Sequence, residues 1–163
     1  MAYKRIPTLA IENAEIFWKN FAGREQQFNA AGKRNFHVFI DDEEMAQRMA
    51  DDGWNVKIKQ PYDETEEPRY HIKVNVDFNS SQPPIIKMIK GRTVVDLDEE
   101  TVGRLDTAEL VQVDLEISPY DYGSKRGGSP AYSGYVKEMY VTIAESRFAA
   151  KYAASEAPEE EPW

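Results

Sequence analysis

Short segments in which polar and apolar residues alternate constrain the fold of this chain most. The clearest is YHIKVNVDF, residues 70–78, in which every second side chain is hydrophobic. Because successive side chains of a strand point to opposite faces, this pattern indicates a strand with one buried face. Further strands are expected at 9–22, 34–40, 54–60, 85–89, 93–95, 111–117 and 134–143. The sequence therefore predicts a mainly β protein.

One helix interrupts this series of strands. Residues 42–51 carry Met45 and Met49 four positions apart, Asp41 or Asp42 can cap the first turn, and Gly53 can end the last one. A shorter helix or turn is expected within 99–110, and a loop rich in Gly, Ser and Tyr at 120–132. Short strands separated by turn clusters favour a small, mainly antiparallel barrel or sandwich.

Composition limits the chemistry that this chain can perform. Its 163 residues suit one domain, and cysteine is absent, which rules out disulfides and thiolate ligands. With only two histidines and no P-loop or metalloprotease motif, we expect no metal and no cofactor. No apolar run is long enough for a membrane span, and we expect a cytoplasmic protein. The net charge of −9, taken alone, argues against nucleic-acid binding.

The distribution of charge reverses that conclusion. Acidic residues form clusters, and the short basic stretches between them also carry aromatic residues. If 54–60 pairs with 70–78, the side chains of Lys57, Lys59, His71 and Lys73 share one outward face that suits a phosphate backbone. The full set of candidate DNA-binding residues is Lys19, Lys33, Arg34, Phe39, Lys57, Lys59, Tyr62, His71, Lys73, Tyr122, Lys125, Arg126 and Tyr132.

Two alternative interpretations remain open for aromatic and acidic residues of these strands. Phe17, Phe21 and Phe39 can instead fill a second hydrophobic face. Asp114 and Glu116 project from one face of a strand and, with Asp77, could hold Mg²⁺ for phosphodiester cleavage. Acidic residues spaced in this way are more often a solvated strand face.

The last residues form a second candidate site. Glu159, Glu160, Glu161, Pro162 and Trp163 close the chain with three carboxylates, a proline and a tryptophan. An exposed Trp on an acidic segment suits a partner pocket that has a hydrophobic slot and a basic rim. We expect residues 154–163 to be a disordered acidic tail that binds partner proteins.

This tail resembles the C-terminal tip of single-stranded DNA-binding proteins, and the body resembles the bacteriophage members of that group. The matching stretches are NAEIFWKNFAG (13–23), GKRNFHVFI (32–40), DGWNVKIK (52–59), VQVDLEISPY (111–120) and YVKEMYVTI (135–143). The resemblance implies an OB-fold barrel that coats single strands without sequence preference. Trp163 stands where the family more often ends in Phe.

From the residues and the resemblance together, we expect a single OB-like domain over residues 1–153 followed by the tail. The expected function is sequence-independent binding of single-stranded DNA in phage replication or recombination, without enzymatic activity and inside the bacterial host cell. Replication or recombination proteins are the expected partners of the tail, and self-association is left open. The alternatives are a Mg²⁺-dependent nuclease and an acidic protein-interaction or DNA-mimic module.

Overall fold

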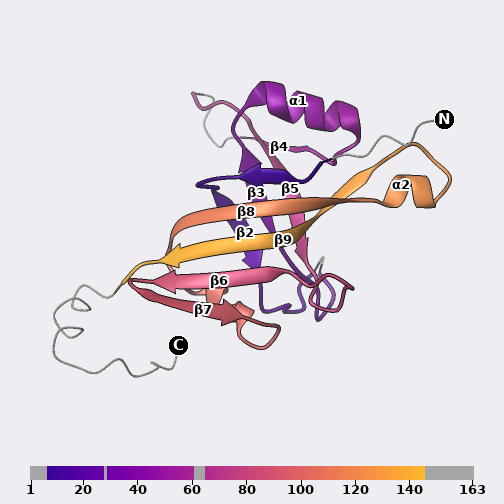
Figure 1. Ribbon diagram of the computed structural model, residues 1–163. Coiled ribbons are helices and arrows are strands. Elements are labelled where there is room, and N and C mark those ends of the chain that lie inside the picture. The colour runs from indigo at the N-terminus through magenta and orange to yellow at the C-terminus, as the bar shows by residue number, and fades with distance from the viewer. Residues whose placement is uncertain (1–6, 28, 61–64, 146–163) are drawn as a thin grey trace, which may run out of the picture.

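A computed structural model describes residues 7–27, 29–60 and 65–145, and its described part is built mainly from strands (Figure 1). The strands are β1 (Leu9–Ile11), β2 (Ile16–Asn20), β3 (Arg34–Ile40), β4 (Lys57–Lys59), β5 (Arg69–Val76), β6 (Ile85–Lys90), β7 (Thr93–Leu97), β8 (Leu110–Asp121) and β9 (Tyr132–Ile143). The helices are α1 (Glu43–Asp52), the 3₁₀ helix η1 (Val102–Asp106) and α2 (Tyr122–Lys125). The expected mainly β class is confirmed.

The nine strands of the described residues belong to one sheet, with β1-β8-β9-β5-β3-β2 as its main path. The short strand β4 pairs with β5, and the β6–β7 hairpin joins the sheet beside β9. Most pairings are antiparallel, but β9 runs parallel to both β5 and β6. The expected mainly antiparallel arrangement is confirmed, and the parallel pairings of β9 with β5 and β6 are a feature that was not predicted.

The first and last strands of the main path, β1 and β2, follow each other directly in the sequence. β1 pairs with β8, whereas β2, only a few residues later, pairs with β3. Between them the Ala14 N–H donates to Val113 O, and the Phe39 N–H donates to Glu15 O. The described strands leave β1 and β2 unpaired with each other, so the barrel is partly open, as OB folds are.

The helix α1 agrees closely with its predicted range. The Asp42 carboxylate accepts hydrogen bonds from the N–H groups of Glu44 and Met45, and Gly53 ends the helix with a φ of +114°. A Cβ at Gly53 would lie 2.5 Å from Pro130 O, so glycine is needed there for space as well as for conformation. No described helix has the length and apolar character that crossing a membrane requires.

One hydrophobic core fills the interior between the strands and the buried face of α1. Trp54 packs there against Tyr132, with ring centroids 6.1 Å apart. Tyr132 is therefore a buried residue at the start of β9, and its expected place in an exposed loop was wrong. Regular alternation along the expected strands 111–117 and 54–60 would bury Val111 and Ile58, yet both are exposed: Val111 lies in a β8 bulge, and β4 is only three residues long.

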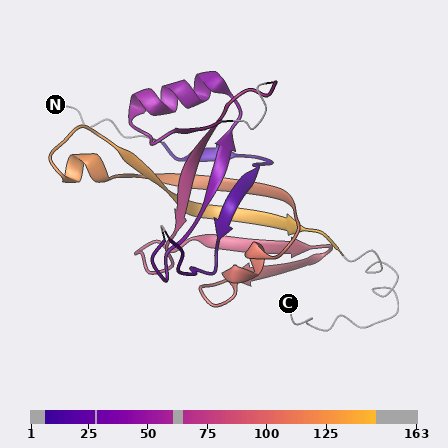
Figure 2. The same ribbon diagram turned by 180° about the vertical axis from the view of Figure 1, so that it is seen from behind.

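The loop expected at 120–132 is shorter than predicted. β8 extends to Asp121 and β9 begins at Tyr132, so the two strands form a long hairpin with α2 at its tip. Figures 1 and 2 both show this hairpin projecting sideways beyond the other strands, with α1 at the top of both views. β2 and β3 cross in front of β8 and β9 in Figure 2.

Candidate nucleic-acid interface

Five ring-bearing side chains gather on the outer face of β2, β3 and β5. We call Phe17, Trp18, His37, Phe39 and His71 the aromatic patch. Every member has another member's ring within about 5 Å: the centroids of Phe17 and Phe39 are 4.3 Å apart, and those of Trp18 and His37 are 5.1 Å apart. Strand register explains the grouping, because Phe17 lies opposite His37 and Phe39 lies opposite His71.

A β-bulge places Phe17 and Trp18, which are neighbours in sequence, on the same face. Phe17 pairs with His37 and Asn20 pairs with Asn35, so Trp18 and Lys19 together oppose one residue of β3. Trp18 has a φ of +48°, a left-handed conformation that is uncommon for a bulky residue. Bulges of this kind re-aim side chains near functional sites. The Trp18 side chain is consequently 60% exposed, and its ring packs edge to face with Phe17, with ring centroids 4.7 Å apart.

Phe39 supports the patch from below. Its ring stacks on Phe17, and the Arg69 guanidinium carbon lies 3.5 Å from the ring centroid. Arg69 is held there by ion pairs to Glu15 at 2.9 Å and to Asp41 at 2.7 Å. Phe39 is therefore only 6% exposed, which matches the hydrophobic-face alternative better than a direct contact with a base.

Three lysines border the aromatic patch. β4 pairs with β5, which confirms the predicted hairpin, and Lys57 lies opposite His71. The Lys59 ammonium lies 4.9 Å from the Phe17 ring centroid and 5.4 Å from that of Trp18. Lys73, exposed on β5, lies opposite His37. An exposed indole beside three cations on one sheet face can stack on a base and contact its phosphates at the same time.

The two histidines form a pair at the centre of the patch, with their Nδ1 atoms 3.0 Å apart. Burial, His71, Lys57 and Lys73 lower the pKa of His37 to about 4. Burial, Lys57 and Lys59 also lower the pKa of His71, which was expected to be an outward-facing contact but is only 3% exposed. Both rings are therefore neutral at pH 7, and one donates to the other.

These lowered pKa values predict a loss of stability in mild acid. Between pH 6.5 and about 4 the unfolded chain binds protons that the folded imidazoles do not, so the free energy of unfolding falls as the pH falls. We expect the double variant His37→Gln/His71→Gln to lose a few degrees less in thermal midpoint than the wild type between pH 7 and pH 4.5. Equal losses in the two proteins, measured by circular dichroism, would contradict this assignment.

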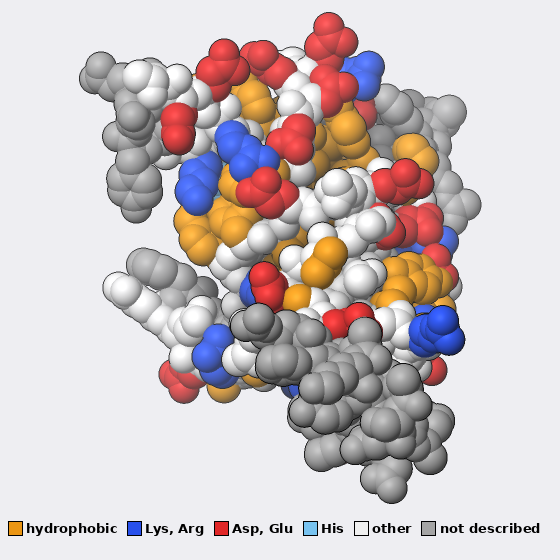
Figure 3. Space-filling model, turned by 90° about the vertical axis from the view of Figure 1, so that its left-hand side faces the viewer, with side chains coloured by type: hydrophobic (Ala, Val, Ile, Leu, Met, Phe, Trp, Pro, Cys, Tyr) orange, Lys and Arg blue, Asp and Glu red, His pale blue; other side chains and the backbone are white. Residues whose placement is uncertain are grey.

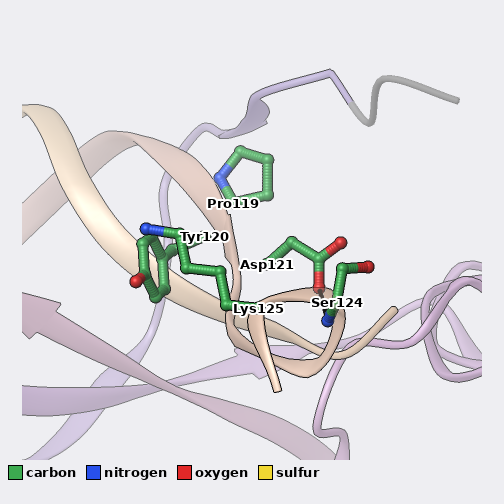
Figure 4. Close-up of a pocket in the computed structure, with 5 residues that line it drawn as sticks. All are labelled: Pro119, Tyr120, Asp121, Ser124 and Lys125. Atoms are coloured by element: carbon green, nitrogen blue, oxygen red, sulfur yellow. Dashed lines mark hydrogen bonds between the residues drawn. The ribbon is translucent and has the colours of Figure 1, made fainter. Parts of the chain in front are cut away.

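A second aromatic and basic group lies at the tip of the β8–β9 hairpin. The Lys125 ammonium lies 4.6 Å from the Tyr120 ring centroid, and a hydrogen bond with Tyr120 raises the pKa of Lys125. Figure 4 shows Lys125 reaching over the Tyr120 ring beside a pocket of about 380 Å³. The Asp121 carboxylate accepts from the N–H groups of Ser124 and Ala131, which fixes the turn, and the Arg126 guanidinium lies 5.8 Å from the Tyr122 ring.

Strand register connects the tip to the aromatic patch. One outward row across four strands consists of Asn35, Asn75, Tyr135 and Ser118, each paired with the next. Tyr135 contacts Tyr120 with ring centroids 5.9 Å apart, and Asn35 is two positions from His37. We call the surface from Trp18 through Lys73 and Tyr135 to Lys125 the outer track.

Other candidate residues lie away from the outer track or have other contacts. Lys19 donates to Leu105 O at 3.0 Å, and burial lowers its pKa. Arg34 pairs with Glu99 at 3.8 Å, and Lys33 is exposed in the turn before β3. Tyr62 and the tail residues Glu159, Glu160, Glu161, Pro162 and Trp163 lie outside the described residues.

The carboxylates of the nuclease alternative have structural partners. Asp114 accepts from the Asn13 N–H at 2.8 Å, where the chain bends between β1 and β2. Glu116 accepts from the Thr8 hydroxyl and lies 3.7 Å from the Lys137 ammonium. Asp77 accepts from the Asn79 N–H at the end of β5. Within residues 7–27, 29–60 and 65–145, no three His, Asp or Glu side chains converge as a metal site.

Sequence reasoning missed Trp18, Arg69 and His37 as members of this surface. A regular strand would point Trp18 and Phe17 in opposite directions, and the bulge that unites them carries no glycine as a signal. Arg69 directly follows a stretch rich in acidic residues, which gives no sign that it lies beside an aromatic ring. His37 had a visible signal, since it is an aromatic residue at an outward position near a basic one.

Charge is unevenly distributed over the face that Figure 3 shows. Figure 3 shows acidic side chains spread over one face of the molecule, with Lys and Arg gathered in a few places, one of them beside hydrophobic side chains at the upper left. The net charge of −9 thus coexists with local basic regions. An anion would be directed to those regions and repelled from the rest.

A family model described as "Putative phage ssDNA-binding domain" matches residues 1–161. The chain belongs to this family. Among the solved structures that resemble its fold are three of the single-stranded DNA-binding protein of bacteriophage Enc34. The complex with ssDNA has a TM-score of 0.54 at 10% identity, covering 86% of this chain and 89% of that one.

The protein without DNA has a TM-score of 0.52 at 9% identity, covering 86% and 83% of the two chains. Its C-terminal truncation has a TM-score of 0.50 at 9% identity, covering 85% and 87%. No curated protein sequence matches the chain. At 9–10% identity these similarities show that this phage ssDNA-binding family member shares the fold of the Enc34 protein. They do not show which of its residues contact DNA.

Proposed function

We propose that this family member binds single-stranded DNA without sequence preference along the outer track. The observation that carries the proposal is Trp18, a largely exposed indole that a strained bulge holds beside Phe17 and Lys59. Keeping a bulky residue at positive φ costs about 1–3 kcal/mol, and such strain is concentrated at functional positions. OB folds bind oligonucleotides on the face of their second and third strands and on the adjoining loops. In this sheet those strands correspond to β3 and β5, and the tip of the β8–β9 hairpin is one of the loops.

The chemistry of the track accounts for binding that ignores sequence. Trp18 and Tyr120 offer ring faces, which stack on any base, and Lys57, Lys59 and Lys73 offer ammonium groups, which meet any phosphate. Neither kind of contact reads the edge of a base, so discrimination among sequences is expected to be small.

The finer role that we propose is in phage DNA replication or recombination, with the tail recruiting the proteins that act on the coated strand. The support is the sequence of residues 155–163, with four Glu and a terminal Trp, which can offer a partner both charge and an aromatic anchor. In this proposal the protein binds DNA and does not cleave it. It acts in the cytoplasm of the bacterial host.

Deleting residues 155–163 is expected to tighten single-strand binding by roughly two- to tenfold at low salt. A tethered anionic segment has a local concentration of order millimolar near a basic surface and competes there with DNA. Screening weakens the competition, so the gain should shrink as salt rises. Fluorescence anisotropy of a labelled oligonucleotide at several salt concentrations measures the effect.

Trp163→Ala is the matched control for this truncation. It keeps every charge, so affinity for DNA should change little, while partner recruitment should fall. Weaker DNA binding by the truncated protein would refute the competition model.

An electrophoretic shift assay with a single-stranded oligonucleotide, with and without Mg²⁺, tests the proposed function. We expect a shifted band and an intact oligonucleotide in both conditions. Cleavage in Mg²⁺ would favour a nuclease, and the absence of both binding and cleavage would favour a protein-interaction module.

A further inference from the structure

The strand β7 forms an outer edge of the sheet. Its strand partner among the described strands is β6, which lies between it and β9 (Figures 1 and 2). A free edge presents unpaired backbone N–H and C=O groups, and an exposed strand of this kind is a template for pairing with another strand. Val94, the second residue of β7, is 56% exposed.

The hairpin turn determines which backbone groups of β7 face outward. β6 and β7 are joined by the two residues Gly91 and Arg92, with Lys90 opposite Thr93 and a φ of +59° at Gly91. In a two-residue hairpin the flanking pair exchanges both backbone hydrogen bonds, and such bonded pairs alternate along the ladder. Thr93 and Val95 therefore bond to β6, whereas the N–H and C=O groups of Val94 and Asp96 point away from it.

The side chains along this edge complement each other under two-fold symmetry. The chain runs from Arg92 through Val94 to Asp96, so charge changes from basic to acidic around a central apolar residue. When two copies pair antiparallel with Val94 opposite Val94, Arg92 of each copy lies opposite Asp96 of the other. In this register the outward N–H and C=O groups of Val94 face those of Val94 in the other copy, so the central backbone pair and the two Arg92–Asp96 charge pairs favour the same alignment.

Residues next to β7 also suit a contact between two copies of this edge. Ile89 lies opposite Val94 on β6 and would widen the apolar centre of the contact. Asp96 already pairs with Lys87 of its own hairpin at 3.2 Å, yet its side chain is 80% exposed and can accept a second cation. Arg92 is exposed. We propose that β7 is a self-association surface through which two copies of this chain join their sheets edge to edge.

The contact area between the two β7 strands is small, and this limits the stability of the dimer. One five-residue strand against another falls below the area of a standard stable interface, so the dimer should be weak and dependent on concentration. The surface lies on the β6–β7 hairpin, apart from the outer track, so pairing leaves the DNA-binding residues accessible. Two copies on one strand of DNA would then raise each other's local concentration.

Sedimentation velocity of the full chain without DNA, over a range of protein concentrations, tests the proposal. The wild type should move from the 18.7 kDa monomer toward twice that mass. Arg92→Glu places acid against acid, and Asp96→Arg places base against base, so each variant should weaken dimerisation at least about tenfold. An equimolar mixture of the two variants restores both pairs and should dimerise as the wild type does.

The mixture separates charge pairing from a folding defect, because a misfolded variant would not recover on mixing. Each variant should also keep the wild-type circular dichroism spectrum and the wild-type affinity for an oligonucleotide that is long enough for only one copy. A wild type that stays monomeric at every concentration would overturn the proposal. Dimers that persist in both single variants, or variants that remain monomeric when mixed, would also overturn it. None of these outcomes bears on single-strand binding, which the oligonucleotide assay tests separately.

Discussion

Replacing Lys57, Lys59 and Lys73 together by alanine is expected to weaken single-strand binding about 100-fold at 0.1 M salt, equally for all sequences. Each lysine that neutralises a phosphate releases counterions, and each lost contact lowers the slope of log affinity against log salt by about 0.7. The triple variant should therefore lose about two units of slope. Anisotropy titrations of poly-dT and mixed-sequence oligonucleotides across a salt series measure both quantities.

The matched control is a triple variant that removes three positive charges outside the outer track. Arg48, Lys87 and Lys90 lie on α1 and β6, outside the outer track. Their joint replacement by alanine should change affinity far less, and only through the net charge. If both triple variants lose the same affinity and slope, the lysines of β4 and β5 do not form the track.

Trp18→Ala is expected to lower affinity by roughly 5- to 150-fold while leaving the salt slope unchanged. Stacking of a base on an aromatic ring contributes about 1–3 kcal/mol and involves no counterion. Tyr140→Ala is the control, because Tyr140 is an exposed aromatic residue on β9 outside the outer track. A drop in slope with Trp18→Ala, or an equal loss with Tyr140→Ala, would contradict the stacking role.

Trp18→Gly adds a test of the strained bulge. Glycine adopts a φ of +48° without strain, so this variant should unfold at a higher temperature than Trp18→Ala and bind DNA equally weakly. Equal midpoints would mean that the conformation of residue 18 carries no cost.

The sequence contained most of the fold because each strand with one buried face has a visible period. Residues 70–78, 34–40 and 42–51 formed the predicted elements, and the helix even has the predicted cap at Asp42. The parallel neighbours of β9 were not visible, since side-chain alternation is the same whichever way the adjacent strand runs.

The candidate site was partly predicted for the same reason. The pairing of 54–60 with 70–78 follows from alternation, and it brought Lys57 and Lys59 beside His71. Trp18 was not predicted, because a bulge interrupts the alternation of side chains in β2. Tyr132 was wrongly predicted to be a contact residue, because a residue that follows a glycine-rich loop can still begin a buried strand. Side-chain stacks such as Phe17 on Phe39 depend on three-dimensional packing that no spacing encodes.

Photocrosslinking of a single-stranded oligonucleotide containing 5-iodouracil, followed by mass spectrometry of the peptides, tests the proposed interface most directly. The account predicts crosslinks at Trp18 on β2 and at Tyr120 near the hairpin tip, with little at Tyr140. Crosslinks confined to Tyr140 and the β6–β7 hairpin, with none on β2, β3 or β8, would contradict it.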